Sequence, residues 1–275
     1  MAAGLLGVAS FLFVDLHALI EAMPLPEGVT VPELPPPAVF KIISLIQPAV
    51  LTTLAVAVGV WLSAKVGLHS PAAEAAASGE PFFTKLKPQI LPGVIAGLAS
   101  GVAIVVGWII AKPFLLAEFV TRAQGFNKFM PHITRFLYGG FTEELLLRWG
   151  VMTFLVWAAW RAFQKGEGSP RSGYFVGAIV VSALVFGMGH LPLAYMLAGA
   201  LTLPLVVYVI TVNSIFGIVA GFLYWKKGLE AAMIAHIFAH VVLISAIARL
   251  MRDRLFSAVL LFDNLVPDNM ACMTM

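Results

Sequence analysis

Charge and cysteine are the two features that this chain has least of. Only 11% of its 275 residues are charged and its mean hydropathy is +0.95, whereas a soluble domain carries about 25% charged residues. This composition excludes an ordinary soluble domain and predicts a polytopic membrane protein. The single cysteine, Cys272, excludes an intrachain disulfide framework and a cysteine-based metal cluster. The net charge of +3, without a basic stripe, gives no case for a nucleic-acid partner.

Apolar runs recur along the chain, and a membrane-spanning helix needs about 20 apolar residues. Eight candidates emerge: 4–20, 40–64, 90–111, 134–162, 173–190, 193–210, 212–226 and 229–250. We therefore expect an all-α polytopic bundle of about eight transmembrane helices around a central catalytic cavity, with several later helices short, tilted or interfacial. The N-terminus has no basic region before its apolar run, which favours a first helix over a cleaved signal peptide. Asp15 and His17 are expected near its end or facing other helices.

Proline, glycine and polar residues mark the connections. A proline-rich link at 23–37 cannot continue a helix, and 67–88 and 161–174 are predicted to be polar loops. Lys and Arg counted on alternate sides of the membrane give nine with the N-terminus (65, 85, 87, 161, 165, 171, 249, 252, 254) and seven opposite (41, 112, 122, 128, 135, 226, 227). By the positive-inside rule this count leans toward a cytoplasmic N-terminus.

The stretch "GGFTEELLLRWG" places Glu143, Glu144 and Arg148 inside one apolar helix. Each charge at a helix centre costs about 2.5–3.5 kcal/mol on insertion scales, so the three need partners or a water-filled cavity. Glu144 and Arg148 stand at i and i+4 in the favourable acid-first order and can neutralise each other. Glu143 is rotated by about 100° from Glu144, which leaves it free for chemistry.

Two further polar clusters lie in apolar helices. In "LVFGMGHLPL", Phe186 and His190 share one face near a helix end, and in "AAMIAHIFAHVVLI", His236 and His240 do the same. The second pair has the spacing of zinc-protease histidines but lacks the adjoining glutamate, so alone it fits a metal half-site, a proton relay or a hydrogen-bonded stack. Together with Glu143, these histidines supply the parts needed to activate a water molecule and hold an oxyanion.

No serine or cysteine lies in a setting suited to a nucleophile. Ser182 has no neighbouring base in the sequence, and Cys272 lies in the tail. Water is therefore the expected nucleophile.

The ordered segments "EELLLR" (143–148), "FGMGH" (186–190) and "HIFAH" (236–240) resemble the three motifs of the CAAX-protease and bacteriocin-processing membrane family. Those motifs read Glu-Glu-x-x-x-Arg, Phe-x-x-x-His and His-x-x-x-Asn, and the resemblance covers about residues 134–245. It implies that Glu143 activates the hydrolytic water with help from His190, and that Glu144 and Arg148 brace the helix. It also implies that His236 and residue 240 form the oxyanion site.

The chain departs from the family pattern at position 240, where histidine replaces the usual asparagine. Neutral histidine also donates one hydrogen bond, but unlike asparagine it readily binds metal. The glycine-spaced segment 216–228 also resembles the family, and its Gly217 and Gly221 are predicted to serve helix packing. The expected organisation is N-terminal helices over 1–130, a CAAX-protease-like catalytic core over 131–250 and a tail over 251–275, within one membrane domain.

The leading hypothesis is a membrane-embedded endopeptidase of the bacterial cytoplasmic membrane that acts on a protein or peptide, lipidated or not, without a cofactor. The alternatives are a zinc protease using Glu143, His190, His236 and His240 as ligands, a non-catalytic immunity or scaffold protein, and a small transporter using the same residues as a proton relay. The chain ends with a formal C-a-a-X sequence at Cys272, which we interpret as coincidence.

Overall fold

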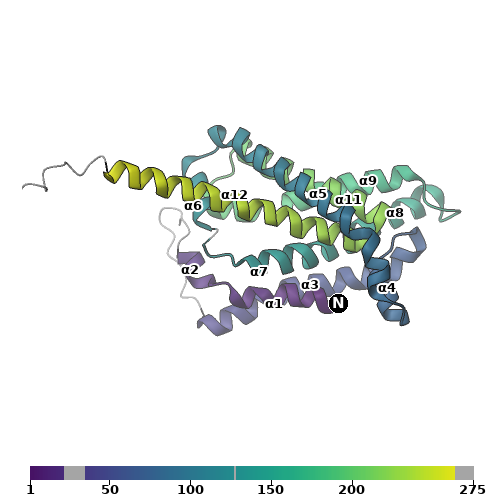
Figure 1. Ribbon diagram of the computed structural model, residues 1–275. Coiled ribbons are helices and arrows are strands. Elements are labelled where there is room, and N and C mark those ends of the chain that lie inside the picture. The colour runs from purple at the N-terminus through teal and green to yellow at the C-terminus, as the bar shows by residue number, and fades with distance from the viewer. Residues whose placement is uncertain (22–34, 127, 264–275) are drawn as a thin grey trace, which may run out of the picture.

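In the computed structural model, all secondary-structure elements of the described residues are helices. The structure describes residues 1–21, 35–126 and 128–263, with side chains as far as residue 249. The expected all-α fold is therefore confirmed (Figure 1). The proline-rich link falls largely, and Cys272 wholly, outside the described residues.

Within the described residues, five helical segments are long and apolar enough to cross a membrane, three fewer than the eight candidates expected. They contain α3 (Pro37–Leu62), α5 (Phe82–Ala111), α9 (Ser172–Gly189), α11 (Leu203–Lys227) and α12 (Leu229–Asp263). Large apolar side chains on the outer faces of α3 and α5 are exposed, including those of Ile42, Ile46, Leu91, Ile95 and Ile109. An apolar outer surface of this kind is suited to lipid rather than water, which supports a multi-pass membrane protein.

The predicted division between candidates 193–210 and 212–226 is wrong. A short helix, α10 (Leu191–Ala198), ends at Gly199, which adopts the left-handed conformation that glycine tolerates. The single long helix α11 then begins at Leu203 with the hydroxyl of Thr202 accepting a hydrogen bond from the Leu205 amide. Because one span replaces two, every basic residue from 226 onward moves to the other side of the bundle.

The corrected topology removes the charge asymmetry. Basic residues at positions 65, 85, 87, 161, 165, 171, 226 and 227 now lie at one end, and those at 41, 112, 122, 128, 135, 249, 252 and 254 lie at the other. The two sets are equal in number, so the positive-inside rule no longer favours either orientation of the N-terminus.

The first apolar run is not one long helix. It forms α1 (Ala2–Ala9), the 3₁₀ turn η1 (Ser10–Phe13) and α2 (Leu16–Glu21). Asp15 accepts a hydrogen bond from the Ala18 amide, 3.1 Å away, at the start of α2, and the His17 ring meets Phe40 of α3 at 5.4 Å. As expected, both polar residues lie at a helix end or against another helix.

The predicted polar loop over 67–88 contains a helix, α4 (Pro71–Ser78), and the first residues of α5. Glu230 of α12 stabilises α4 by accepting hydrogen bonds from the amides of Ala72 and Ala73, at 3.0 and 2.9 Å, and from the Ser70 hydroxyl. A carboxylate bound to the exposed amides at a helix N-terminus satisfies donors that have no partner within the helix. This long-range cap is why the loop prediction failed here.

The helix that carries the two glutamates is continuous from 132 to 164 but is not α-helical throughout. It consists of α7 (His132–Thr134), the π-helices η4 (Arg135–Glu143) and η5 (Leu145–Met152), and α8 (Thr153–Gln164). π-Helices are rare and are frequently found at functional sites. The remaining short elements are η2 (Ser63–Val66), η3 (Lys112–Phe114) and α6 (Ala117–Phe126).

This helix runs through the middle of the bundle (Figure 1). On one side η4 packs against α1 and η5 against α3, while on the other η4 meets α12 and η5 meets α9 and α11. Thr142 and Thr134 fasten it to the N-terminal segment by donating hydrogen bonds to the carbonyls of Gly4 and Ser10, at 2.8 and 3.0 Å. The charged groups on η4 and η5 are thereby enclosed by helices rather than by lipid.

Small residues set the spacing of the neighbouring helices. A Cβ atom added at Gly217 would lie 2.8 Å from Ala183 of α9, and one at Gly221 would lie 3.0 Å from Ile179. This confirms the packing role predicted for both glycines. Glycines 93, 97 and 101 on α5 approach α12 in the same way.

We expect Gly97→Ala to destabilise the bundle by about 1–3 kcal/mol, the usual effect of overpacking. The added methyl would clash with the Ala235 carbonyl oxygen, a backbone atom that cannot rotate away. Thermal unfolding of the detergent-purified protein measures the effect. Gly177→Ala is the matched control, because Gly177 is an exposed helical glycine with no atom within 4 Å of the added methyl. A similar loss of stability in both variants would contradict close α5–α12 packing at Gly97.

Candidate active site

The buried ion pair of Glu144 and Arg148 is the centre of the site. Glu144 Oε2 lies 3.2 Å from Arg148 Nε, and the two side chains are 0% and 1% exposed. Arg148 also donates a hydrogen bond to the Gly217 carbonyl at 3.2 Å. Because a guanidinium keeps its proton and needs an anionic partner when buried, Glu144 is ionised. The pairing predicted from the i, i+4 spacing is confirmed.

Two aromatic rings enclose the Arg148 guanidinium. Its central carbon lies 4.9 Å from the centre of the Phe186 ring and 5.5 Å from that of Phe216. Cation–π contacts with desolvated guanidinium groups are worth about 2 kcal/mol or more each at good geometry. The rings also exclude water, which strengthens the attraction between Glu144 and Arg148.

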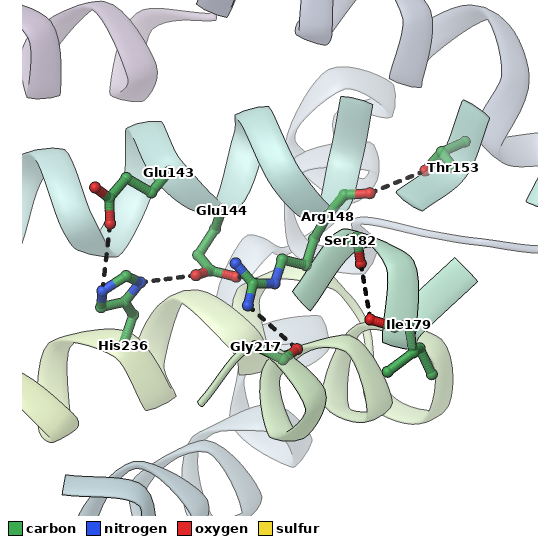
Figure 2. A network of polar contacts seen from close by, with 8 residues as sticks. All are labelled: Glu143, Glu144, Arg148, Thr153, Ile179, Ser182, Gly217 and His236. Atoms are coloured by element: carbon green, nitrogen blue, oxygen red, sulfur yellow. Dashed lines mark hydrogen bonds and ion pairs between the residues drawn. The ribbon is translucent and has the colours of Figure 1, made fainter. Parts of the chain in front are cut away.

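His236 lies between the two glutamates, as Figure 2 shows. Its Nδ1 is 2.7 Å from Glu144 Oε1, and its Nε2 is 3.6 Å from Glu143 Oε2. An ionised carboxylate only accepts hydrogen bonds, so Nδ1 is the donor to Glu144. A neutral imidazole carries a single proton, and the second nitrogen, which faces Glu143, is therefore an acceptor.

Glu143 differs from its neighbour in both partner and exposure. Its side chain is 20% exposed, against 0% for Glu144, and it contacts His236 rather than Arg148. The ion pair leaves one carboxylate available, as the spacing predicted. Since Glu143 can reach both solvent and the acceptor nitrogen of His236, it is the group in this cluster best suited to take a proton from a bound molecule.

His190 is held by its own helix. Its Nδ1 donates to the Phe186 carbonyl at 2.8 Å, which leaves Nε2 as an acceptor. The Phe186 ring meets the His190 ring at 4.7 Å and the His236 ring at 6.0 Å, both edge to face. Phe186 thus lies between the two imidazoles and helps to orient both, which agrees with their expected grouping.

His240 stacks on His236 with ring centres 5.0 Å apart and planes inclined by 19°, so the two share one face of α12 as predicted. Its Nδ1 is buried and has no hydrogen-bond partner within the described part of the chain. The proton of His240 is therefore not assigned to either nitrogen by a neighbouring group. In this respect it differs from His190 and His236.

Three residues of the site were not found from the sequence. Phe216 packs against His236 at 4.4 Å, Gly217 supplies a carbonyl to Arg148, and Gly139 lies beside the Nε2 atoms of His236 and His240. Gly217 was noted only for packing. Nothing in the spacing of Phe216 or Gly139 indicates a contact with a histidine on another helix.

Ser182 is not placed as a nucleophile. Its buried hydroxyl donates to the Ile179 carbonyl of its own helix at 3.1 Å (Figure 2). Among the described residues Ser182 therefore has no base as its hydrogen-bond partner, and water as the attacking group stays a prediction.

The zinc alternative gains no geometric support. Among the described residues, no group of three or more His, Cys, Asp or Glu side chains is arranged to hold a metal ion. His236 has Nδ1 engaged by Glu144, and His190 has Nδ1 engaged by a backbone carbonyl, so each keeps Nε2 to offer a metal. Histidines that bind metals usually make such contacts through their second nitrogen, and these two hydrogen bonds therefore do not count against zinc.

Comparison with known proteins places the site within a family. Residues 125–242 match the family described as type II CAAX prenyl endopeptidase Rce1-like. Neither the curated proteins nor the solved structures contain a match to this chain. The matched region includes Glu143, Glu144, Arg148, His190 and the paired histidines of α12. Residues 125–242 therefore carry an Rce1-like type II CAAX prenyl endopeptidase domain, as the motifs of this region indicated.

Proposed function

We propose that the protein is a membrane-embedded endopeptidase that hydrolyses a peptide bond with a water molecule activated by Glu143. Membership of an endopeptidase family implies a peptidase acting on protein or peptide substrates. The observation that carries the proposal is the arrangement of His236, which is bound to ionised Glu144 through Nδ1 and faces the partly exposed Glu143 through Nε2.

The two groups that face each other across 3.6 Å, Glu143 Oε2 and His236 Nε2, are both acceptors. A water molecule that donates one hydrogen to each would satisfy both and would present its oxygen lone pair to a substrate carbonyl. As this oxygen attacks, one proton passes to the Glu143 carboxylate, and an oxyanion forms on the former carbonyl oxygen. Glu143 then returns the proton to the leaving amine as the carbon–nitrogen bond breaks.

The donor that stabilises the oxyanion is assigned to His240. The family resemblance shares this role between His236 and residue 240, but the one proton of neutral His236 is engaged by Glu144. His240 is free to carry its proton on Nε2 because no neighbouring group fixes it on Nδ1. Removal of one oxyanion donor typically lowers kcat by about 10²–10³-fold.

His190 has the supporting role. With Nδ1 engaged by the Phe186 carbonyl, its Nε2 is an acceptor that can orient the attacking water or the substrate amide. The organisation that follows is a catalytic core over 131–250, preceded by helices over 1–130 and followed by a tail over 251–275. A water-accessible cavity would reach Glu143 within the bundle.

The test is cleavage of a farnesylated CaaX peptide by detergent-purified protein, followed by mass spectrometry. We expect loss of the terminal tripeptide. The same peptide with a free cysteine is the matched control for the lipid, because equal cleavage of both would show that the prenyl group is not recognised. Absence of cleavage across prenylated and unprenylated peptides would favour a scaffold or immunity protein.

Metal dependence is tested on the same preparation. Activity that survives a strong chelator, in protein with less than one equivalent of zinc by elemental analysis, supports the glutamate mechanism. Activity that is lost with the metal and restored by added zinc would favour the metalloprotease with Glu143, His190, His236 and His240 as ligands.

A further inference from the structure

Gly139 lies on η4, four residues before Glu143, where α12 comes closest to the site. A Cβ atom at this position would lie 2.7 Å from His240 Nε2, 3.2 Å from His240 Cδ2 and 3.1 Å from His236 Nε2. The nearest atoms that a methyl group would meet are thus the tips of the two stacked imidazoles. The lack of a side chain at 139 allows the Nε2 edges of both rings to lie directly against the helix that carries Glu143.

We propose that Gly139 is a positioning residue, whose lack of a side chain leaves room for the Nε2 edge of His240 at the place where the oxyanion forms. The inference rests on the proposed function, because it names the feature that sets the position of the proposed oxyanion donor. In the proposed mechanism Gly139 does not touch the reacting atoms, and it acts only through the position of His240.

The geometry indicates which atoms give way when a methyl group is added. His240 Nε2 is the free end of a side chain with no hydrogen bond to hold it among the described residues, so its ring can turn aside. His236 is held by Glu144 at 2.7 Å and moves less readily. Gly139→Ala should therefore displace the His240 ring while the helices stay in place, in contrast to Gly97→Ala, where the obstacle is a backbone oxygen.

The requirement for glycine at position 139 follows from the histidine at position 240. A histidine side chain reaches further than an asparagine, and it is the far nitrogen of the ring that meets position 139. The shorter His240→Asn side chain removes the closest of these contacts, and the nearest remaining one for an added methyl at 139 is His236 Nε2, at 3.1 Å. Gly139 and His240 are thus a size-matched pair, and their substitutions should not be additive.

The neighbouring glycine provides a matched control. A Cβ at Gly140 would lie 2.6 Å from Ile237 Cγ1, an apolar side chain between the two histidines on α12, and it would not meet either imidazole. Gly140→Ala therefore adds the same methyl to the same π-helix, against the same partner helix, without reaching the site.

The experiment measures kcat and KM for peptide cleavage, and the midpoint of thermal unfolding, for Gly139→Ala, Gly140→Ala, His240→Asn and the Gly139→Ala/His240→Asn double variant. We expect Gly139→Ala to lower kcat about 100-fold, the effect of a displacement of about 1 Å at a reacting group, with little change in KM. Gly140→Ala should keep kcat within about threefold of wild type. Gly139→Ala should lower the midpoint of unfolding in the wild-type background, and this shift should be smaller in the His240→Asn background.

Equal effects of Gly139→Ala and Gly140→Ala on kcat would overturn the positioning role. An unfolding shift from Gly139→Ala that is unchanged in the His240→Asn background would overturn the pairing with His240. The unfolding measurement needs no substrate, so it decides the pairing even if wild-type protein cleaves no peptide. Failure of the wild-type protein to cleave the peptide would overturn the proposed function, but the unfolding measurement would still show whether Gly139 and His240 form a pair.

Discussion

Glu143→Gln should abolish peptide cleavage and leave the folded protein intact. Glutamine keeps the size of the side chain but cannot accept a proton from water, and general-base catalysis is worth about 10²–10⁴ in rate. We expect kcat to fall at least about 1,000-fold with KM changed little, because the proposed step lies in the chemistry rather than in binding. Single-turnover cleavage followed by mass spectrometry measures this loss.

The stability of the Glu143→Gln variant should stay close to that of wild type. Glu143 is partly exposed, and the ionisable side chain that it approaches, at 3.6 Å, is neutral His236, so glutamine leaves no buried charge without a partner in the described part of the chain. Cleavage by Glu143→Gln at the wild-type rate would remove Glu143 from the mechanism. A marked fall in its unfolding midpoint would make the carboxylate a structural group.

Glu144→Gln changes the next residue in the same way, and its main effect should be on stability. The substitution leaves the Arg148 guanidinium buried without an anion, a change that costs about 3–5 kcal/mol. For a chain of this size we expect the midpoint of thermal unfolding to fall by roughly 10 °C. Activity should fall as well, because His236 Nδ1 loses the charge that fixes its proton.

Removing both charges of the Glu144–Arg148 ion pair separates its effect on stability from its effect on activity. Glu144→Leu with Arg148→Met replaces the buried ions with apolar side chains, which is often neutral or stabilising. The double variant should recover most of the lost stability, but not the activity, since His236 would lack a carboxylate partner. If Glu144→Gln unfolds like wild type, the ion pair is not the stabilising element of the site, and the distinction between the two glutamates is lost.

The helices differ in how well the sequence predicted them. Apolar runs of the right length predicted all four of the helices α3, α5, α9 and α12, because the requirement to cross a lipid core is read directly from composition. The ends of α3 and α9 were close to those predicted, whereas α5 begins at Phe82 rather than at 90 and α12 continues to Asp263 rather than ending at 250. The runs 193–210 and 212–226 were misread because no local signal distinguishes a short helix followed by a long one from two medium helices. The Gly199 turn set the division instead.

The π-helical backbone of 135–152 could not be predicted from residue spacing. Propensity and periodicity distinguish a helix from a strand, but one turn of π-helix differs from α-helix by a single hydrogen-bond register. The choice depends on the helices packed around it. On opposite sides these include α1, held by Thr142, and α12, held by His236.

Within one helix, spacing alone determined what could meet. Glu144 and Arg148, Phe186 and His190, and His236 and His240 are each four residues apart, and each pair lies in contact because helical geometry brings i and i+4 together. The ordered motifs also indicated the family whose model matches residues 125–242. Contacts between helices had no such local rule. Only the packed bundle placed His236 between the glutamates, assigned its proton to Nδ1, and put Gly139 against the imidazoles, since these depend on which helix faces pack together and how closely.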